Sequence, residues 1–281
     1  MNALDFSRTL AADVSAALAE DVATGDLTAA MIPADRSAHA TLITREAALL
    51  CGIPWFEGCF WRLDPNIRTT WHAKEGQRVA ANSIVCEMEG NARALLTAER
   101  AALNFLQLLS GVATETRRYV DAVAGTGAAI MDTRKTVPGL RVAQKYAVRI
   151  GGGVNQRMGL FDGILIKENH IAAAGGIAPA LRATQAYARA GIGIQIEVEN
   201  LVELEQALDA DAKLILLDNF NLDQMREAVR LTAGRAQLEA SGGITLETVR
   251  AIAETGVDRI SIGSLTKQVR AVDLSLRLDD R

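Results

Sequence analysis

Six short apolar runs recur after residue 125, and this rhythm constrains the fold more than any other feature of the chain. The runs are AIMD (129–132), GILI (163–166), IQIEV (194–198), LILLD (214–218), QLEA (237–240) and RISI (259–262). Stretches with helical periodicity separate most of them. Apolar strands that alternate with helices indicate βαβ units and a parallel sheet buried on both faces. Such a sheet forms either a barrel or a doubly wound layer.

Each run ends in, or leads to, a polar, charged or glycine residue, and this favours the barrel. A barrel gathers the carboxyl ends of all its strands around one mouth, with phosphate sites commonly in the last two loops. A doubly wound sheet concentrates its ligand groups at one switch point instead. The residues at these ends are Arg134, Lys135, Lys167, Glu197, Asp218, Ser241, Gly242, Gly243, Gly263 and Ser264. The sequence therefore predicts an α/β barrel over residues 113–265.

The first hundred residues show a different pattern of apolar and turn-forming residues. Short apolar runs broken by Gly and Pro predict strands and hairpins in HATLITRE, ALLCGIPWF, RTTWHAKEGQRV and SIVCEMEG. A helix-rich connection follows, in which Leu103, Leu106 and Leu109 give a wide buried face. We expect residues 1–112 to form an N-terminal domain that includes this connection, with the tail 266–281 packing back on it.

Composition and charge exclude several classes of protein. The 281 residues are 49% hydrophobic and carry a net charge of −4, unlike a disordered chain or a generally basic nucleic-acid binder. No apolar run reaches the length of about 18 residues that a membrane helix needs, and the N-terminus lacks the pattern of a secretory signal. Three cysteines in apolar surroundings fit buried thiols in a reducing compartment, so we expect a cytoplasmic protein.

The stretch 134–167 departs from this acidic average, because it holds seven Lys or Arg residues and a single acid, Asp162. Lys145 and Arg149 fit a solvated helix face. Arg134, Lys135 and Lys167 do not, since they follow apolar strands. Arginine suits carboxylates and phosphates by bidentate bonding, and lysine supplies a compact charge. The predicted ligand is therefore a polyanion.

The remaining strand ends suggest complementary roles. Glycines after the last two strands allow a close approach of backbone N–H groups to a phosphate, with ordinary turn chemistry as the alternative. Glu197 and Asp218 suit sugar hydroxyls or Mg²⁺ with substrate phosphates, and they could also pair with Lys135 or Lys167. His170 could cap the following helix or touch the substrate. The sequence alone leaves Arg100 on a helix surface.

Taken in order, these segments closely resemble the quinolinate phosphoribosyltransferase family, also called carboxylating nicotinate-nucleotide pyrophosphorylases. The matching stretches are EDVATGDLT, NFLQLLSGVAT, DTRKTVPGLR, KYAVRIGGG, LIKENHI, EVEN, LLDNF, EASGGI and SIGSLT. They cover most of the chain after residue 95 and one segment near the start.

The resemblance implies an N-terminal α/β sandwich domain joined to an incomplete, seven-stranded α/β barrel, in a homodimer or a larger oligomer. It implies a pentosyltransferase of NAD biosynthesis that joins quinolinate to phosphoribosyl pyrophosphate with Mg²⁺. The products are nicotinate mononucleotide, pyrophosphate and carbon dioxide.

The resemblance also assigns roles to residues. Arg134, Arg157 and, from the partner subunit, Arg100 would bind the quinolinate carboxylates. Lys135 and Lys167 would contact anionic groups of both substrates. Glu197 and Asp218 would hold the ribose hydroxyls, directly or through Mg²⁺. The Ser241–Gly243 and Gly263–Ser264 loops would hold the 5′-phosphate.

One position departs from the family pattern. Gln156 stands where family members commonly have histidine, directly before Arg157. Gln cannot carry a positive charge, but its amide can donate to a carboxylate. We therefore expect Gln156 to bind quinolinate without any acid–base role.

Three rival functions fit parts of the same pattern. A barrel aldolase would use Lys167 as a Schiff-base nucleophile. A molybdenum-transport-associated homologue of this family would employ the fold differently, although the LIKENHI segment favours the phosphoribosyltransferase. A pure ligand-binding protein would not need charged or polar groups at six successive strand ends.

Overall fold

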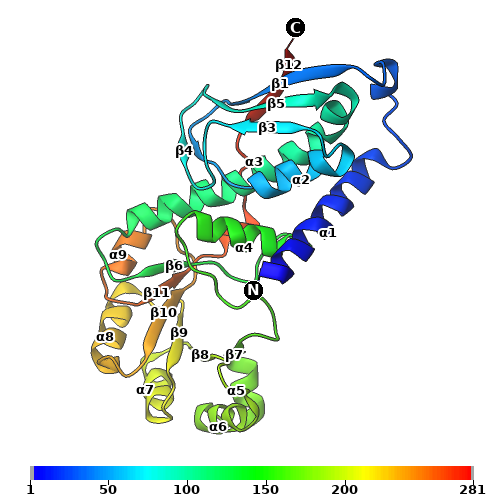
Figure 1. Cartoon of the computed structure of the whole chain (residues 1–281). Coiled ribbons are helices and arrows are strands. Elements are labelled where there is room, and N and C mark those ends of the chain that lie inside the picture. The colour runs from blue at the N-terminus through cyan, green and yellow to red at the C-terminus, as the bar shows by residue number, and fades with distance from the viewer. Residues whose placement is uncertain (1–2, 280–281) are drawn as a thin grey trace. The chain divides into compact units, whose positions relative to one another are not determined.

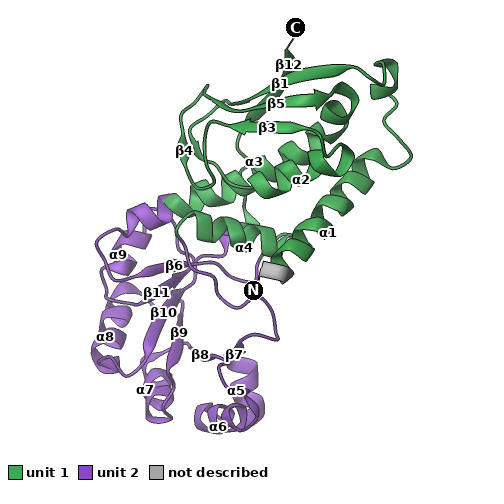
Figure 2. Cartoon of the chain, in the orientation of Figure 1, with its two compact units in different colours: residues 1–117, 136–152, 266–281 green, residues 118–135, 153–265 purple. Residues whose placement is uncertain are grey.

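The computed structural model describes residues 3–279, with side chains from residue 6 onward, and divides into two compact units (Figures 1 and 2). Unit 1 contains the residues up to 117, residues 136–152 and the residues from 266 onward. Unit 2 contains residues 118–135 and 153–265. The division differs from the predicted one at residues 113–117 and 136–152. The second of these segments belongs to unit 1 because its helix buries Ala143, Ala147 and Val148 in the unit 1 core.

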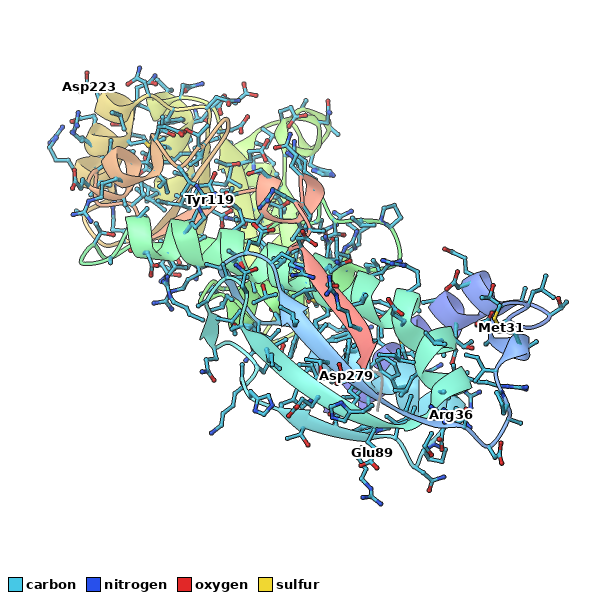
Figure 3. All side chains as sticks on the ribbon, turned by 90° about the horizontal axis from the view of Figure 1, so that it is seen from above. Met31, Arg36, Glu89, Tyr119, Asp223 and Asp279 are labelled. Atoms are coloured by element: carbon cyan, nitrogen blue, oxygen red, sulfur yellow. The ribbon has the colours of Figure 1, made fainter. Side chains whose placement is uncertain are left out.

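Unit 1 is built around a four-stranded antiparallel sheet in the order β12-β1-β5-β3. Its strands are β1 (Ser37–Thr44), β3 (Arg68–Trp71), β5 (Ile84–Asn91) and β12 (Leu274–Asp279). A separate two-stranded pair joins β2 (Ala48–Leu49) to β4 (Arg78–Val79). His39 of β1 lies opposite both Glu89 and Asp279, and its Nδ1 is 2.7 Å from the Asp279 carboxylate (Figure 3 labels both acids). The C-terminal strand therefore completes the sheet that the N-terminal segments begin.

Helices cover one side of this sheet and supply most of the unit 1 core. They are α1 (Ala3–Val22), the 3-10 turn η1 (Ala29–Met31), α2 (Ile53–Leu63), α3 (Ala92–Ala122) and α4 (Arg141–Ile150). Trp55, Phe56 and Phe60 of α2 are fully buried, and Leu103, Leu106 and Leu109 of α3 are buried as predicted. Helix α3 confirms the predicted helical connection.

The prediction of strands was wrong for the second half of ALLCGIPWF. Only Ala48–Leu49 is a strand, and helix α2 begins at Ile53. The reason is a distant cap: the Glu75 carboxylate accepts hydrogen bonds from the N–H groups of Gly52 and Ile53, at 2.7 and 3.1 Å. Pro54 adds the fixed φ that suits a first helical turn. The alternation of apolar residues is a local pattern, so it could not reveal that Glu75, more than twenty residues away, caps the start of helix α2.

Unit 2 contains the six predicted strands in a single parallel sheet with helices between them. The strands are β6 (Ala129–Met131), β7 (Ile164–Ile166), β8 (Ile194–Val198), β9 (Leu214–Asp218), β10 (Gln237–Ser241) and β11 (Arg259–Ser261). The helices are α5 (Glu168–Ala174), α6 (Ile177–Tyr187), α7 (Leu201–Asp209), α8 (Leu222–Thr232) and α9 (Val249–Ala253), and α10 (Ser264–Lys267) begins at the end of the unit.

The order of the strands confirms an incomplete barrel. The sheet runs β6-β11-β10-β9-β8-β7, so β7 to β11 follow one another without reversal and β6 closes against β11. A doubly wound sheet would reverse its order at a switch point. Val154 adds an isolated parallel bridge to Met131 on the other side of β6, where a seventh strand would lie. Among the described residues no strand pairing joins Val154 to β7, so the barrel is not closed there.

No helix among residues 3–279 is long and apolar enough to cross a membrane.

A glycine in the middle of α3 fixes the path of the C-terminal segment across unit 1. A Cβ at Gly111 would lie on the backbone oxygen of Arg270, closer than any real contact allows. Beside it, the Val272 N–H donates to Gln107 O and the Gln107 side chain donates to Leu274 O, both at 3.1 Å. The helix and the segment that leads to β12 therefore touch backbone to backbone.

We predict that Gly111→Ala destabilises the protein, although alanine is favoured over glycine by about 1 kcal/mol in a helix. The added methyl group must displace the Arg270 backbone, and overpacking of this kind costs about 1–3 kcal/mol. The free energy of unfolding, measured by denaturant titration, should fall. Gly127→Ala is the matched control, because a Cβ at Gly127 meets nothing within 4 Å. A more stable Gly111→Ala protein would show that the segment does not run against α3.

Candidate active site

The charged residues that the sequence predicts for the site of unit 2 lie at the carboxyl ends of its strands. Lys135 follows β6, Lys167 follows β7, and Glu197, Asp218 and Ser241 lie in the last two positions of β8, β9 and β10. Because the strands are parallel, these ends share one edge of the barrel. Five of the sequence-predicted groups are thereby brought to the same mouth.

An ion pair joins two of these strand ends. The Lys167 Nζ lies 3.2 Å from the Glu197 Oε2, and Glu197 is 9% exposed. Burial raises the pKa of the Glu197 carboxyl, the Lys167 ammonium opposes that rise, and the negative charges of Asp218 and Glu168 add to it. Several carboxylates therefore lie close to the Lys167–Glu197 ion pair. An ion-paired ammonium is not a nucleophile, so this geometry gives the aldolase reading no support.

A second feature of unit 2 is an electrostatic interaction between two arginines, Arg134 and Arg157. Burial lowers the pKa of Arg157, the positive charge of Arg134 lowers it further, and Asp162 opposes both. The Arg157 Nη1 donates to Gly163 O at 3.0 Å, which holds the side chain in place. Two guanidinium groups held near each other suit a ligand with two negative groups.

The loop after β10, which contains Gly242 and Gly243, forms a tight turn beside Asp218. Gly242 adopts a left-handed φ of 108°, and a Cβ there would overlap the Asn219 side chain. The Asn219 N–H donates to Ser241 O at 3.0 Å, and its Nδ2 donates to Asp218 Oδ2 at 2.9 Å. Gly243 also has a positive φ, of 58°, with open space where a Cβ would stand. Gly242 permits the loop to turn so close to the neighbouring strand end, and Gly243 takes a left-handed φ that most other residues rarely adopt.

Glycine also allows a close approach between the first and last strand ends of the barrel. A Cβ at Gly263 would lie 3.2 Å from Lys135 Cδ and 3.5 Å from Thr133 Oγ1. The Lys135 N–H donates to Thr133 Oγ1 at 3.0 Å, which folds the segment after β6 into a turn. Lys135 and the Gly263–Ser264 loop are therefore direct neighbours.

Sequence reasoning missed a buried polar network behind this mouth. The Gln156 Nε2 and the Gln195 Nε2 each donate at 2.9 Å to Glu239, one to each carboxylate oxygen. Glu239 is only 1% exposed, and burial raises its pKa despite these bonds. An acid inside the apolar run QLEA is the signal that could have revealed it. The Gln156 amide thus points at an internal carboxylate.

A second buried carboxylate holds the same segment from β6. Asp132 is fully buried and accepts hydrogen bonds from Asn155 Nδ2 at 2.6 Å and from the Gln156 N–H at 2.9 Å. Asp132 was not singled out from the sequence, and Asn155 was predicted only as a neighbour of an anion.

Burial corrects one interpretation of the basic stretch, and a hydrogen bond shows one role of a residue that follows it. The prediction of a solvated Lys145 was wrong, because Lys145 is 1% exposed within α4, whereas Arg149 is exposed. His170 caps its own helix: its Nδ1 accepts the Lys167 N–H at 3.0 Å.

Arg100 lies apart from these residues in the sequence and belongs to unit 1. It is exposed on α3 and lines a groove of about 410 Å³ formed by α1, α3 and residues 138–140.

A small acidic cavity adjoins the ion pair in unit 2. It has a volume of about 150 Å³ and is lined by Glu168, Ile171, Ala172, Glu197, Glu199 and Glu203. Within residues 3–279 no three His, Cys, Asp or Glu side chains converge closely enough to hold a metal ion by themselves. A cation at this mouth would need ligands from a substrate in addition to protein carboxylates.

Comparison with known proteins matches both units to one family. The family model for the quinolinate phosphoribosyl transferase N-terminal domain matches residues 24–110, and the model for its C-terminal domain matches residues 112–277. A probable carboxylating nicotinate-nucleotide pyrophosphorylase from Bacillus subtilis is 42% identical over 92% of this chain and 89% of its own length. A decarboxylating quinolinate phosphoribosyltransferase from Nicotiana tabacum is 41% identical over 94% of this chain and 80% of its own length.

The fold agrees with solved structures of the same group. The structure of the nicotinate-nucleotide pyrophosphorylase from Francisella tularensis superimposes with a TM-score of 0.93 and 46% identity, covering 97% of this chain and 96% of the other. The arrangement of strand-end charges therefore lies on a fold and a sequence shared along nearly the whole chain. The protein belongs to the quinolinate phosphoribosyltransferase family.

Proposed function

We propose that the protein transfers the phosphoribosyl group of phosphoribosyl pyrophosphate to quinolinate. The reaction releases pyrophosphate and carbon dioxide and forms nicotinate mononucleotide, a step of NAD biosynthesis. The observation that carries the proposal is the set of charged residues at the strand ends of unit 2, with the Lys167–Glu197 ion pair, together with the electrostatically interacting arginines Arg134 and Arg157. Quinolinate has two adjacent carboxylates, and two arginines held close together are complementary to them. The names of the relatives support the same reaction.

The quinolinate subsite would consist of Arg134, Arg157 and Lys167, with Gln156 beside them. Binding two highly anionic substrates together would be repulsive without such a cluster of cations. The second subsite would bind phosphoribosyl pyrophosphate through Lys135 and the backbone N–H groups of the Ser241–Gly243 and Gly263–Ser264 loops. Lys135 contacts the second of these loops directly, so one pocket could hold several phosphate oxygens.

The carboxylates at the ends of β8 and β9 would serve the transferred ribose. As pyrophosphate departs, positive charge develops at the anomeric carbon and ring oxygen, and Glu197 or Asp218 would stabilise it. Lys135 and Lys167 would stabilise the departing pyrophosphate. The pyridine nitrogen attacks and needs no protein nucleophile. Once this nitrogen is cationic, its charge stabilises the electron pair that stays on C2 when the C2–carboxylate bond breaks and carbon dioxide leaves, and C2 then takes up a proton from solvent.

Mg²⁺ fits the oxygen donors of this mouth. Mg²⁺ is usually bound by one or two protein carboxylates and by substrate phosphates, and it keeps several water ligands. Two neighbouring carboxylates at this mouth match that requirement. Glu197 and Asp218 would hold it, directly or through water. When bound, it would neutralise charge on the pyrophosphate.

The functional unit would be a homodimer, in which Arg100 of one subunit completes the quinolinate subsite of the other. Arg100 is exposed on α3, and no residue proposed for the subsites in unit 2 is within thirty positions of it in the sequence. The three cysteines are buried free thiols, which supports our placing the protein in the reducing cytoplasm.

An end-point assay tests the function. Purified protein is incubated with quinolinate, phosphoribosyl pyrophosphate and Mg²⁺, and nicotinate mononucleotide is followed by chromatography, with nicotinate replacing quinolinate in a parallel reaction. We expect product from quinolinate only. Product from nicotinate only would mean that the pocket has lost its need for the 2-carboxylate. No product from either, in folded protein that binds phosphoribosyl pyrophosphate, would favour the transport-associated homologue.

Lys135→Ala and Lys167→Ala should each lower kcat by about 10²–10³-fold, the usual cost of removing one preorganised charged group. Circular dichroism should show that both variants remain folded, because Lys167 is about half exposed and Lys135 is in a turn. Lys213→Ala, an exposed lysine at the start of β9, is the control and should retain its kcat. Near-normal turnover in either test variant would remove that lysine from the mechanism.

Mixing Arg100→Ala with Lys167→Ala subunits should restore activity that neither variant has alone. In a dimer with shared sites, each heterodimer regains one site with both residues intact. Steady-state rates should rise on mixing, and the quinolinate KM of the restored site should match that of the unmodified enzyme. Verified heterodimers without restored activity would show that each subunit works with its own Arg100.

The pH profile should report Glu197. Its raised pKa means that the carboxylate is lost as the pH falls, at a pH above the usual range of a glutamate, and kcat/KM should decline there. The negative charge of Glu168 contributes to the rise. Glu168→Gln should therefore move the acid limb of the profile to lower pH. Glu203→Gln, which changes another wall of the same cavity, should leave the limb in place. If the acid limb of the kcat/KM profile is unchanged in both variants, it reports the titration of a group other than Glu197.

A further inference from the structure

The two guanidinium groups of unit 2 repel each other, so something must hold each of them in position. The positive charge of Arg134 disfavours the charged form of Arg157, which means that the two groups interact unfavourably in the absence of a ligand. Arg157 is anchored at its tip by Gly163 O. One hydrogen bond at the end of a long side chain does not fix the direction in which that side chain leaves the backbone. That direction depends on the residue before it.

Gln156 is fixed at two points, and the two bonds come from different strands. Its backbone N–H donates to Asp132 Oδ1 next to β6, and its side-chain Nε2 donates to Glu239 Oε1 in β10. A residue held at both the backbone and the end of its side chain has little freedom in φ and ψ. The backbone that carries Arg157 is therefore oriented by Gln156.

Glu239 is held in place by its strand and by several hydrogen bonds to its side chain. It lies in the third position of β10, paired to β9 on one side and β11 on the other, and is 1% exposed. The Gln195 Nε2 of β8 holds its second oxygen at 2.9 Å, and Ser261 of β11 bonds to it as well. A buried polar group with all its bonds made is rigid and costly to disturb.

We propose that Glu239 is a positioning residue for the proposed reaction: it holds the Gln156 amide and thereby sets where the Arg157 guanidinium meets a substrate carboxylate. Glu239 does not touch the substrate in this scheme. Gln156 acts through its bond to Glu239 and not as a ligand of quinolinate. The proposal rests on the proposed function, since it assigns Arg157 to the quinolinate subsite.

The test uses three variants of the full-length protein. Glu239→Gln keeps the shape of the side chain but replaces one of its two acceptor oxygens with an NH₂ group, which then faces the NH₂ group of Gln156 or of Gln195. Gln156→Met removes one of the two 2.9 Å bonds to Glu239, and Gln195→Met removes the other. The two Met variants are a matched pair, because each deletes an equal bond to the same carboxylate and only Gln156 is adjacent to Arg157.

The measurements are quinolinate binding by calorimetry, the quinolinate KM, and crystal structures of the variants. We expect Glu239→Gln and Gln156→Met to weaken quinolinate binding by about 10- to 100-fold, the scale of a 1 Å misplacement of a binding group. Gln195→Met should bind within about threefold of the unmodified protein, since Gln195 lies on β8 and keeps the Gln156–Glu239 bond that precedes Arg157 intact. The bond from Arg157 Nη1 to Gly163 O should be lost in the first two variants and kept in the third.

Three outcomes would overturn the proposal. Equal weakening in Gln195→Met would make Glu239 a general support of the barrel. Weakening in Gln156→Met alone would make Gln156 a direct ligand. An unmoved Arg157 in the crystal structure of Gln156→Met would break the link between the two residues, even if Glu239→Gln fails to fold. Failure of the proposed function is distinguishable, because the unmodified protein would then neither bind nor consume quinolinate while the position of Arg157 could still be compared among the crystals.

Discussion

Repulsion between like charges is the constraint on which the active-site half of this molecule depends. Its proposed substrates are polyanions, so the protein must concentrate cations, yet Arg134 and Arg157 already disfavour each other before any ligand arrives. A parallel barrel solves this problem by fixing each charged side chain at the end of a different buried strand. Burial of the apolar runs, and not attraction between the site residues, supplies the free energy that keeps these groups together. The stability of the barrel core and the affinity of the site are therefore linked.

The same constraint accounts for the carboxylates that lie beneath and beside the cations. Glu197 pairs with Lys167 at the mouth, and Glu239 and Asp132 are buried where they accept hydrogen bonds from the Gln156 segment. These acids differ in their exposure to a ligand. Glu197 is next to the groups that would meet ribose, whereas Glu239 is surrounded by Gln156, Gln195 and Ser261 and is suited to hold its neighbours. One residue type thus has two roles, set by depth in the barrel.

Much of this fold could be predicted from the sequence, because apolar runs and strand ends are local signals. All six strands of unit 2 and the helix through Leu106 appear where periodicity placed them. The errors concern features that depend on distant partners. Helix α2 begins at Ile53 because Glu75 caps it, and Lys145 is buried although its helix reads as a charged surface. Glu239 was overlooked since its importance lies in Gln156 and Gln195, which are far from it in the sequence. The site roles themselves depend on a ligand, and they stay predictions.

The assembly of unit 1 from three separate segments has a consequence for how the chain folds during synthesis. The edge strand β12 pairs with β1, so the four-stranded sheet cannot be completed until residues 274–279 have been made. Unit 2, which is encoded between residues 118 and 265, has all its strands available earlier. Until β12 has been made, the N-terminal segments can form at most the three-stranded sheet β1-β5-β3, in which β1 is an edge strand. Unit 1 therefore cannot complete its fold before unit 2 has been synthesised, unlike an N-terminal domain that folds first during synthesis.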